Sequence, residues 1–126
     1  MPNRREANFS TVLRHWLVAN PLYTCALEAK QTTTDSIPFS DVSQAQLDWG
    51  MAISSNKGIL LRVQAVAEGM PDYIYMRNEP AFVVIRYPHF FVLILVEIFI
   101  KEKVMSERKS LTDKRARQIA SVVVDL

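Results

Sequence analysis

Glu28 and Lys30 have residue types and a spacing that could hold a divalent metal ion beside a phosphate or a water. They end a segment, residues 22–30, whose roughly alternating apolar and polar residues predict a β-strand. Side chains two positions apart on a strand share a face, so this carboxylate and this ammonium group are expected to lie side by side. A carboxylate gives Mg²⁺ a hard oxygen ligand, and a lysine stabilises charge on a phosphate or orients an attacking water. Taken alone, the pattern equally describes an ion pair on an exposed strand face.

Two predicted helices and a polar loop surround this strand. Apolar residues recur at helical spacing along residues 4–18, which predicts a first helix with one apolar face. Residues 31–39 are expected to form a polar loop rich in threonine. A second helix is expected to begin at Ser40, or at Ser43 with Gln46 completing a capping box.

The remainder of the chain predicts a sheet and a last short helix. Four β-prone stretches are separated by turn residues, namely 58–66, 72–76, 81–87 and 90–96, and Thr112 is expected to cap a helix that runs to Ala120. The apolar run 90–100 is shorter than the ~20 residues of a membrane span and contains Glu97, so it is expected to be a buried strand. This order of elements predicts an α/β (α+β) fold with a mixed β-sheet flanked by helices.

Composition excludes several classes of protein. The chain has 126 residues, a formal net charge of +2 and one cysteine, Cys25. A single cysteine excludes a scaffold of internal disulfides and a Cys-rich zinc site. The sequence contains no glycine-rich phosphate-binding loop, so no nucleotide cofactor is expected. The first residues lack the apolar stretch of a signal peptide, so no membrane association is expected. Positive charge is concentrated in residues 101–117, where seven basic residues stand against three acidic ones.

The segment LEAKQTTTDSIPFSDVSQAQL, residues 27–47, resembles the core of the RecU-type Holliday junction resolvases. The shared features are a strand ending in E-A-K, a Thr-rich loop, an aromatic-proline element and a helix that carries a glutamine. This family belongs to the PD-(D/E)xK nucleases. The resemblance implies a single nuclease-like domain over residues 1–126, with a restriction-endonuclease-like core and a basic C-terminal segment at residues 101–120. It also implies Mg²⁺-dependent hydrolysis of phosphodiester bonds.

The resemblance implies roles for individual residues as well. Glu28 would be a metal ligand and catalytic, Lys30 would be the catalytic lysine, and Gln46 would orient the phosphate or the water. Glu6 matches an acidic residue that many of these nucleases place near the metal. The family's metal-binding aspartate is expected before the E-x-K strand, where this chain has none. Asp72, in the sequence G-M-P-D, either reaches the Glu28 site from a neighbouring strand or belongs to a turn.

Branched DNA is the implied partner, bound by a homodimer that presents two sites to symmetry-related strands. The candidate contacts to DNA phosphates are basic and hydroxyl side chains, namely Arg4, Arg5, Thr32, Thr33, Arg108 and Lys109. Such residues are also common on faces that only solvent contacts. The resemblance further implies a cytoplasmic location, in a bacterial cell or a phage-infected host.

Two functions stay open at the level of sequence. The first is a structure-selective DNA endonuclease that resolves Holliday junctions or other branched DNA with Mg²⁺, or with Mn²⁺ in its place. The second is a noncatalytic DNA-binding or recombination-assembly protein with a degenerate nuclease site. The intact Glu28-Ala29-Lys30 with Gln46 favours the endonuclease. The missing aspartate, and the strand Val84-Ile85-Arg86 with no acidic residue, favour the second function.

Overall fold

The computed structural model describes residues 4–20, 25–63 and 72–126 of the chain. The parts of the predicted strands that fall in residues 22–24 and 64–66 lie outside the described residues. The side chains of Arg4, Arg5, Glu6 and Asp72 also lie outside them, although their backbone is described. Within these ranges, no helix is both long and apolar enough to cross a membrane.

A four-stranded mixed sheet forms the centre of the molecule, in the order β1-β5-β6-β8. Its strands are β1 (Ala26–Gln31), β5 (Ala81–Tyr87), β6 (Phe90–Leu95) and β8 (Val122–Asp125). β1 pairs with β5 in parallel, whereas β5–β6 and β6–β8 are antiparallel. Strand β1 is therefore an edge strand, and the chain between β1 and β5 crosses one face of the sheet.

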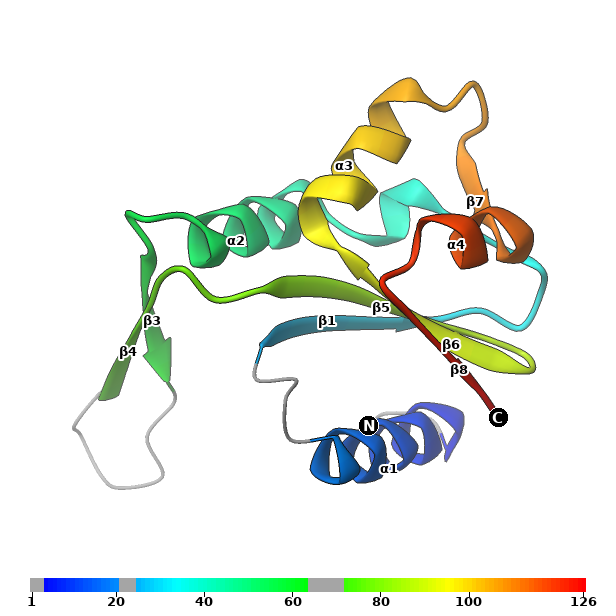
Figure 1. Cartoon of the computed structure of the whole chain (residues 1–126), viewed down its shortest axis with the longest axis horizontal. Helices are drawn as coiled ribbons and strands as arrows, with labels where there is room; N and C mark the ends of the chain where they lie inside the picture. The colour runs from blue at the N-terminus through cyan, green and yellow to red at the C-terminus, as the bar shows by residue number, and fades with distance from the viewer. Residues whose placement is uncertain (1–3, 21–24, 64–71) are drawn as a thin grey trace.

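Helices cover both faces of this sheet (Figure 1). One face carries α1 (Arg4–Ala19), and the opposite face carries α2 (Gln44–Ser54), α3 (Val96–Met105) and α4 (Asp113–Ile119). Two small antiparallel sheets complete the fold: β2 (Ser36–Pro38) with β7 (Ser110–Thr112), and β3 (Ile59–Val63) with β4 (Asp72–Met76). A short 3-10 helix, η1 (Phe39–Asp41), connects β2 toward α2. The predicted α+β class, a mixed sheet flanked by helices, is confirmed.

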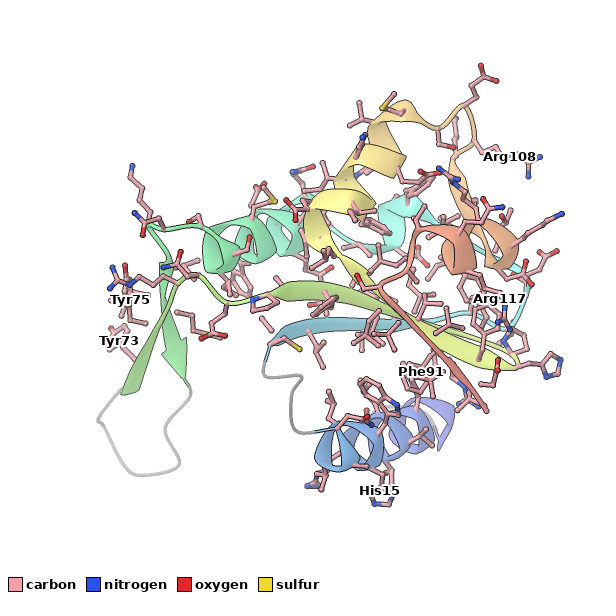
Figure 2. The ribbon with its side chains drawn as sticks, in the orientation of Figure 1. His15, Tyr73, Tyr75, Phe91, Arg108 and Arg117 are labelled. Carbon is pink, nitrogen blue, oxygen red and sulfur yellow. The ribbon has the colours of Figure 1, made fainter. Side chains whose placement is uncertain are left out.

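The core is divided by the sheet into two layers, because successive strand residues point to opposite faces. Val83 and Ile85 of β5 join the larger cluster beneath α2, α3 and α4. Phe82 and Val84 join a smaller cluster with Phe9 and Leu13 of α1. Figure 2 shows Phe91 of β6 on the α1 side, where its ring meets that of Phe9 at 5.7 Å between centroids. Strands β5 and β6 are thus buried on both faces, which explains their unbroken apolar sequence.

The largest departure from the predicted elements lies in residues 90–100. The expected single strand is instead β6, which ends at Leu95, followed at once by α3, which begins at Val96. The apolar run contains no glycine, proline or polar cap to mark this boundary, so composition alone gives no signal for it. Strands β2, β7 and β8 were also not expected. The helix over residues 4–18 and the Thr112-capped helix are confirmed as α1 and α4.

Candidate active site

Glu28, Lys30 and Gln46 meet at a single oxygen atom. Gln46 Nε2 donates a hydrogen bond of 2.8 Å to Glu28 Oε1, and Lys30 Nζ lies 3.4 Å from the same oxygen. The side chains of Lys30 and Glu28 are 27% and 35% exposed, so the group lies at the surface and a ligand can reach it. The three residues to which the resemblance assigned catalytic roles therefore form one cluster.

The register of the sheet places the two charged residues on the side of the second helix. Glu28 is paired with Val83 and Lys30 with Ile85 across β1 and β5. Paired residues on neighbouring strands point to the same face, and both β5 residues belong to the cluster beneath α2. The alternation of β1 therefore directs both side chains toward the layer that contains Gln46.

A capping box at the start of α2 fixes the amide of Gln46. The Ser43 N–H donates to Gln46 Oε1 at 2.9 Å, and the Gln46 N–H donates to Ser43 Oγ at 3.1 Å. The amide oxygen is thus occupied by the cap, which leaves Nε2 as the group that faces Glu28. The expected Ser43 capping box is confirmed, and it serves to orient the donor at the candidate site.

The surroundings of the cluster are apolar on one side. A cavity of about 70 Å³ lies between β1, β5 and α2, and Glu28, Gln46 and Trp49 contribute to its lining. Trp49 is 55% exposed and was not among the predicted site residues. Its helical spacing from Gln46 is the signal that places both on one side of α2. No described residue forms a hydrogen bond with Glu28 Oε2, and the Glu28 side chain is 35% exposed, so a ligand can reach this carboxylate.

The structure does not bring the positions of Asp72 and Glu6 to this cluster. Asp72 is the first residue of β4, which pairs with β3 in a separate two-stranded sheet. The strand next to β1 is β5, so β4 is not the hydrogen-bonded neighbour from which Asp72 would reach Glu28. The Asp72 side chain lies outside the described residues, and a metal-binding role for it stays a prediction. Glu6 belongs to α1, and α1 packs on the face of the sheet opposite the Glu28 side chain.

The donor groups at the cluster suit Mg²⁺ only in part. Among the described residues, no group of three or more His, Cys, Asp or Glu side chains could hold a metal ion. Mg²⁺ in proteins is bound through one or two carboxylates and completes its shell with waters and substrate phosphates. Glu28, a partly exposed carboxylate, fits the single-carboxylate case, in which a substrate phosphate and water supply the remaining ligands.

The predicted DNA contacts lie on different sides of the molecule. Thr32 Oγ1 donates to the Ser36 carbonyl at 2.9 Å within a local network of the loop, whereas Thr33 is exposed. Arg108 and Lys109 are exposed residues just before β7 (Figure 2). Arg4 and Arg5 begin α1, across the sheet from these. One straight DNA segment lying on one face would not contact all of them.

An ion pair that the sequence did not predict joins the last two helices. Arg115 of α4 binds the Glu102 carboxylate through two hydrogen bonds, from Nε at 2.8 Å and from a terminal nitrogen at 3.0 Å. The hydrogen bond from Arg115 holds the pKa of Glu102 below its usual range. Glu102 and Arg115 both belong to the charged segment 101–117, but the sequence did not predict that they form an ion pair with each other.

No family model matches this sequence, and no curated protein and no solved structure matches it either. A function for this chain therefore has to be argued from its residues and their geometry.

Proposed function

We propose that this chain is a Mg²⁺-dependent endonuclease that hydrolyses phosphodiester bonds in branched DNA such as Holliday junctions. The observation that supports this most strongly is the meeting of Gln46 Nε2 and Lys30 Nζ at Glu28 Oε1. An ordinary ion pair on a strand needs no third residue. Here a donor from another element, with its amide orientation fixed by a helix cap, holds the carboxylate in place.

Each residue of the cluster has a distinct task under this proposal. Glu28 would hold the metal, while Gln46 donates a hydrogen bond to its Oε1. Lys30 offers an ammonium group that stabilises negative charge on the phosphate under attack. Gln46 keeps the carboxylate in one orientation, so that little reorganisation is needed when substrate binds. Mg²⁺, when bound, would neutralise phosphate charge and favour ionisation of a water.

A homodimer is part of the proposal. A four-way junction has symmetry-related strands, and a two-fold dimer would present one Glu28 cluster to each of two strands. Paired incisions on opposite strands would follow from this arrangement.

One observation favours the noncatalytic alternative. The described residues supply one carboxylate to the cluster, and β5, the strand beside β1, presents Val83 and Ile85 on the Glu28 face rather than a second acid. A site with too few ligands for a metal would leave a protein that binds branched DNA without cutting it.

The experiment that separates the two functions measures binding and cleavage of one labelled four-way junction in Mg²⁺ and in Mn²⁺. The endonuclease proposal expects incision by the wild-type chain, and loss of incision with retained binding in Glu28→Ala and Lys30→Ala. Glu79→Ala, which removes a carboxylate outside the cluster, is the matched control and should cleave normally. Binding by the wild-type chain without cleavage in either metal would refute the endonuclease and favour the alternative.

A further inference from the structure

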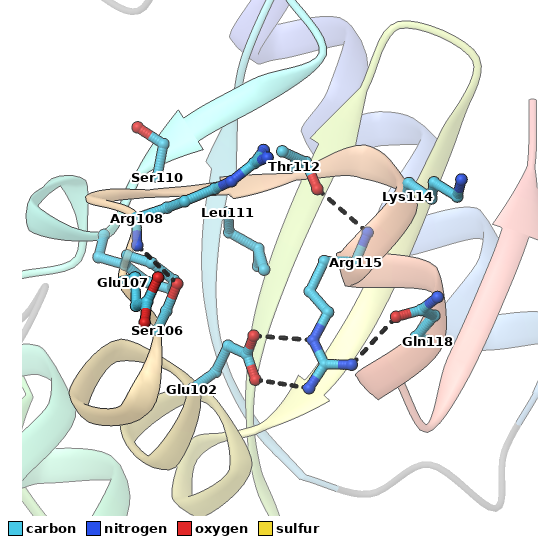
Figure 3. Close-up of a pocket in the computed structure, with 11 residues that line it drawn as sticks. Glu102, Ser106, Glu107, Arg108, Ser110, Leu111, Thr112, Lys114, Arg115 and Gln118 are labelled. Atoms are coloured by element: carbon cyan, nitrogen blue, oxygen red, sulfur yellow. Dashed lines mark hydrogen bonds and ion pairs between the residues drawn. The ribbon is translucent and has the colours of Figure 1, made fainter.

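A second cavity, lined largely by polar residues, lies at the other end of the helical layer, between α3, β7 and α4. Its volume is about 460 Å³, and Figure 3 shows the residues that line it. The polar side chains that matter for its chemistry are Glu102, Glu107, Arg108, Ser110, Lys114 and Arg115. None of its lining residues belongs to the Glu28 cluster or lines the cavity beside it. The proposed catalytic roles therefore do not account for it.

The ion pair between Glu102 and Arg115 forms a fixed wall of this cavity. Besides its two bonds to Glu102, Arg115 donates to Gln118 Oε1 at 3.0 Å through its other terminal nitrogen. The pair is close to neutral as a unit, and it links α3 to α4 (Figure 3). Arg115 is thus already committed to protein partners.

Two other basic side chains of the cavity have no acidic partner among the described residues. Arg108 and Lys114 are exposed, and neither side chain pairs with an acidic residue in the described part of the chain. The hydroxyl of Ser110 lies in the same lining. A guanidinium, an ammonium and a hydroxyl are the donors that recognise phosphate oxygens. Glu107 is the one unpaired acid of this lining, so the free charge there is positive.

The backbone that carries these donors is held firmly. Strand β7 pairs with β2, and the Phe39 N–H donates to the Lys109 carbonyl at 3.0 Å. The buried Tyr87 hydroxyl donates to the Leu111 carbonyl, also at 3.0 Å. A site built on a fixed backbone loses less conformational freedom when a ligand binds.

We propose that this cavity is a phosphate-binding site in which Arg108 and Lys114 hold the phosphate oxygens. The phosphate belongs either to a DNA backbone or to a small phosphorylated molecule, which share this chemistry. The proposal does not rest on the endonuclease function, because the two sites have no residue in common. Loss of cleavage at Glu28 would leave it unaffected.

The test is a titration of the folded chain with inorganic phosphate at constant ionic strength, followed by amide chemical shifts, with a parallel titration by a short linear DNA duplex. Arg108→Ala and Lys114→Ala should each weaken phosphate binding about tenfold. Lys101→Ala is the matched control, because it removes a positive charge from an exposed residue of α3 that does not line the cavity. Glu107→Gln removes the unpaired acid and should strengthen binding.

The two titrations decide whether the cavity binds phosphate and which kind of molecule supplies it. Saturable phosphate binding that Arg108→Ala weakens and Lys101→Ala does not weaken supports the site. If duplex binding shows the same difference between the two variants, the phosphate is that of DNA. If duplex binding does not distinguish them, the ligand is a small phosphorylated molecule. Absence of saturable phosphate binding, or equal weakening by Arg108→Ala and Lys101→Ala, would overturn the proposal.

Discussion

At the scale of single residues, the side-chain amide of Gln46 connects helix formation to the candidate chemistry. Its oxygen closes the capping box with Ser43, and its nitrogen binds Glu28. The two bonds use opposite ends of one planar group, so the cap determines which end faces the carboxylate. Local folding of α2 thereby positions a side chain of β1.

Replacement of Gln46 by alanine should reduce both stability and cleavage. The truncated side chain leaves the Ser43 N–H without its partner, which should lower the free energy of unfolding by about 1 kcal/mol. It also frees the Glu28 carboxylate, and loss of such an orienting partner typically lowers activity about 10- to 100-fold. Chemical denaturation and single-turnover cleavage of a labelled junction measure the two effects.

Gln44→Ala is the control for this prediction. Gln44 lies on the same turn of α2 and bonds the exposed Asp48 rather than Glu28. Its removal should change the unfolding free energy by less than about 0.5 kcal/mol and leave cleavage unchanged. Equal cleavage by Gln46→Ala and Gln44→Ala would show that the Glu28 bond has no functional role.

The sequence foretold some of these contacts and not others, for a physical reason. Ser43 and Gln46 are three residues apart, so their capping box follows from local pattern. The pairing of Glu28 and Lys30 on one face follows from strand alternation. Which strand lies beside β1 depends on long-range pairing, so local pattern leaves both alternatives for Asp72 open, a neighbouring strand or a turn.

At the scale of elements, the close approach of α2 to α3 depends on a residue without a side chain. Gly50 is buried in α2, and a Cβ built there would lie 2.7 Å from Val96 Cγ2 and 3.1 Å from Val96 Cγ1. Both methyl groups of the valine are in the way, so a change of its rotamer would not remove the clash. Gly50 therefore sets the distance between the helices that cover the Glu28 side of the sheet.

Gly50→Ala should destabilise the fold despite the better helix propensity of alanine. Overpacking typically costs about 1–3 kcal/mol, whereas alanine gains at most about 1 kcal/mol over glycine within a helix. Thermal or denaturant unfolding should show the net loss. Combining Gly50→Ala with Val96→Ala should be less destabilising than the sum of the two single changes. A Gly50→Ala chain as stable as the wild type would contradict this packing.

The bond between α3 and α4 predicts a pH-dependent contribution to stability. Arg115 lowers the pKa of Glu102 in the folded chain. The stabilisation is therefore fully present above the ordinary glutamate pKa of about 4.3 and is lost as the pH falls through the lower folded-state value. Glu102→Gln should be less stable than the wild type at pH 7, and the difference should disappear in strong acid.

Glu107→Gln is the matched control for this pH dependence, because Glu107 has no ion-pair partner among the described residues. Unfolding by urea at a series of pH values would compare the two variants with the wild type. A Glu102→Gln deficit that stays constant from pH 7 to strong acid would show that the ion pair does not contribute.

The start of a helix was predictable where the sequence contains a capping residue. Thr112 marks the start of α4 and Ser43 that of α2, and both act as N-caps. The junction of β6 and α3 carries no such mark, because Leu95 and Val96 are both apolar, the first partly buried and the second buried. Strand β7 is only three residues long, and it pairs with β2, which is distant in the sequence. A local pattern of residues therefore does not predict this strand.

At the scale of the whole molecule, the sheet separates two environments. The face covered by α2, α3 and α4 carries both the Glu28 cluster and the phosphate-site cavity, whereas α1 and its basic start occupy the other face (Figure 1). A nucleic acid bound along the first face could engage both sites at once. The net charge of +2 for the whole chain does not show this distribution, because the excess of basic residues is concentrated in residues 101–117, in and between α3 and α4.

The most direct test of the central claim is single-turnover cleavage of a labelled four-way junction in Mg²⁺ by the wild type and by Glu28→Gln. This substitution keeps the size of the side chain and removes the charge that would hold the metal. We expect the wild type to incise the junction, and Glu28→Gln to bind it equally well and to cleave it at least about 100-fold more slowly. Equal cleavage by the two chains, or none by the wild type, would contradict the assignment of the Glu28 cluster as a nuclease site.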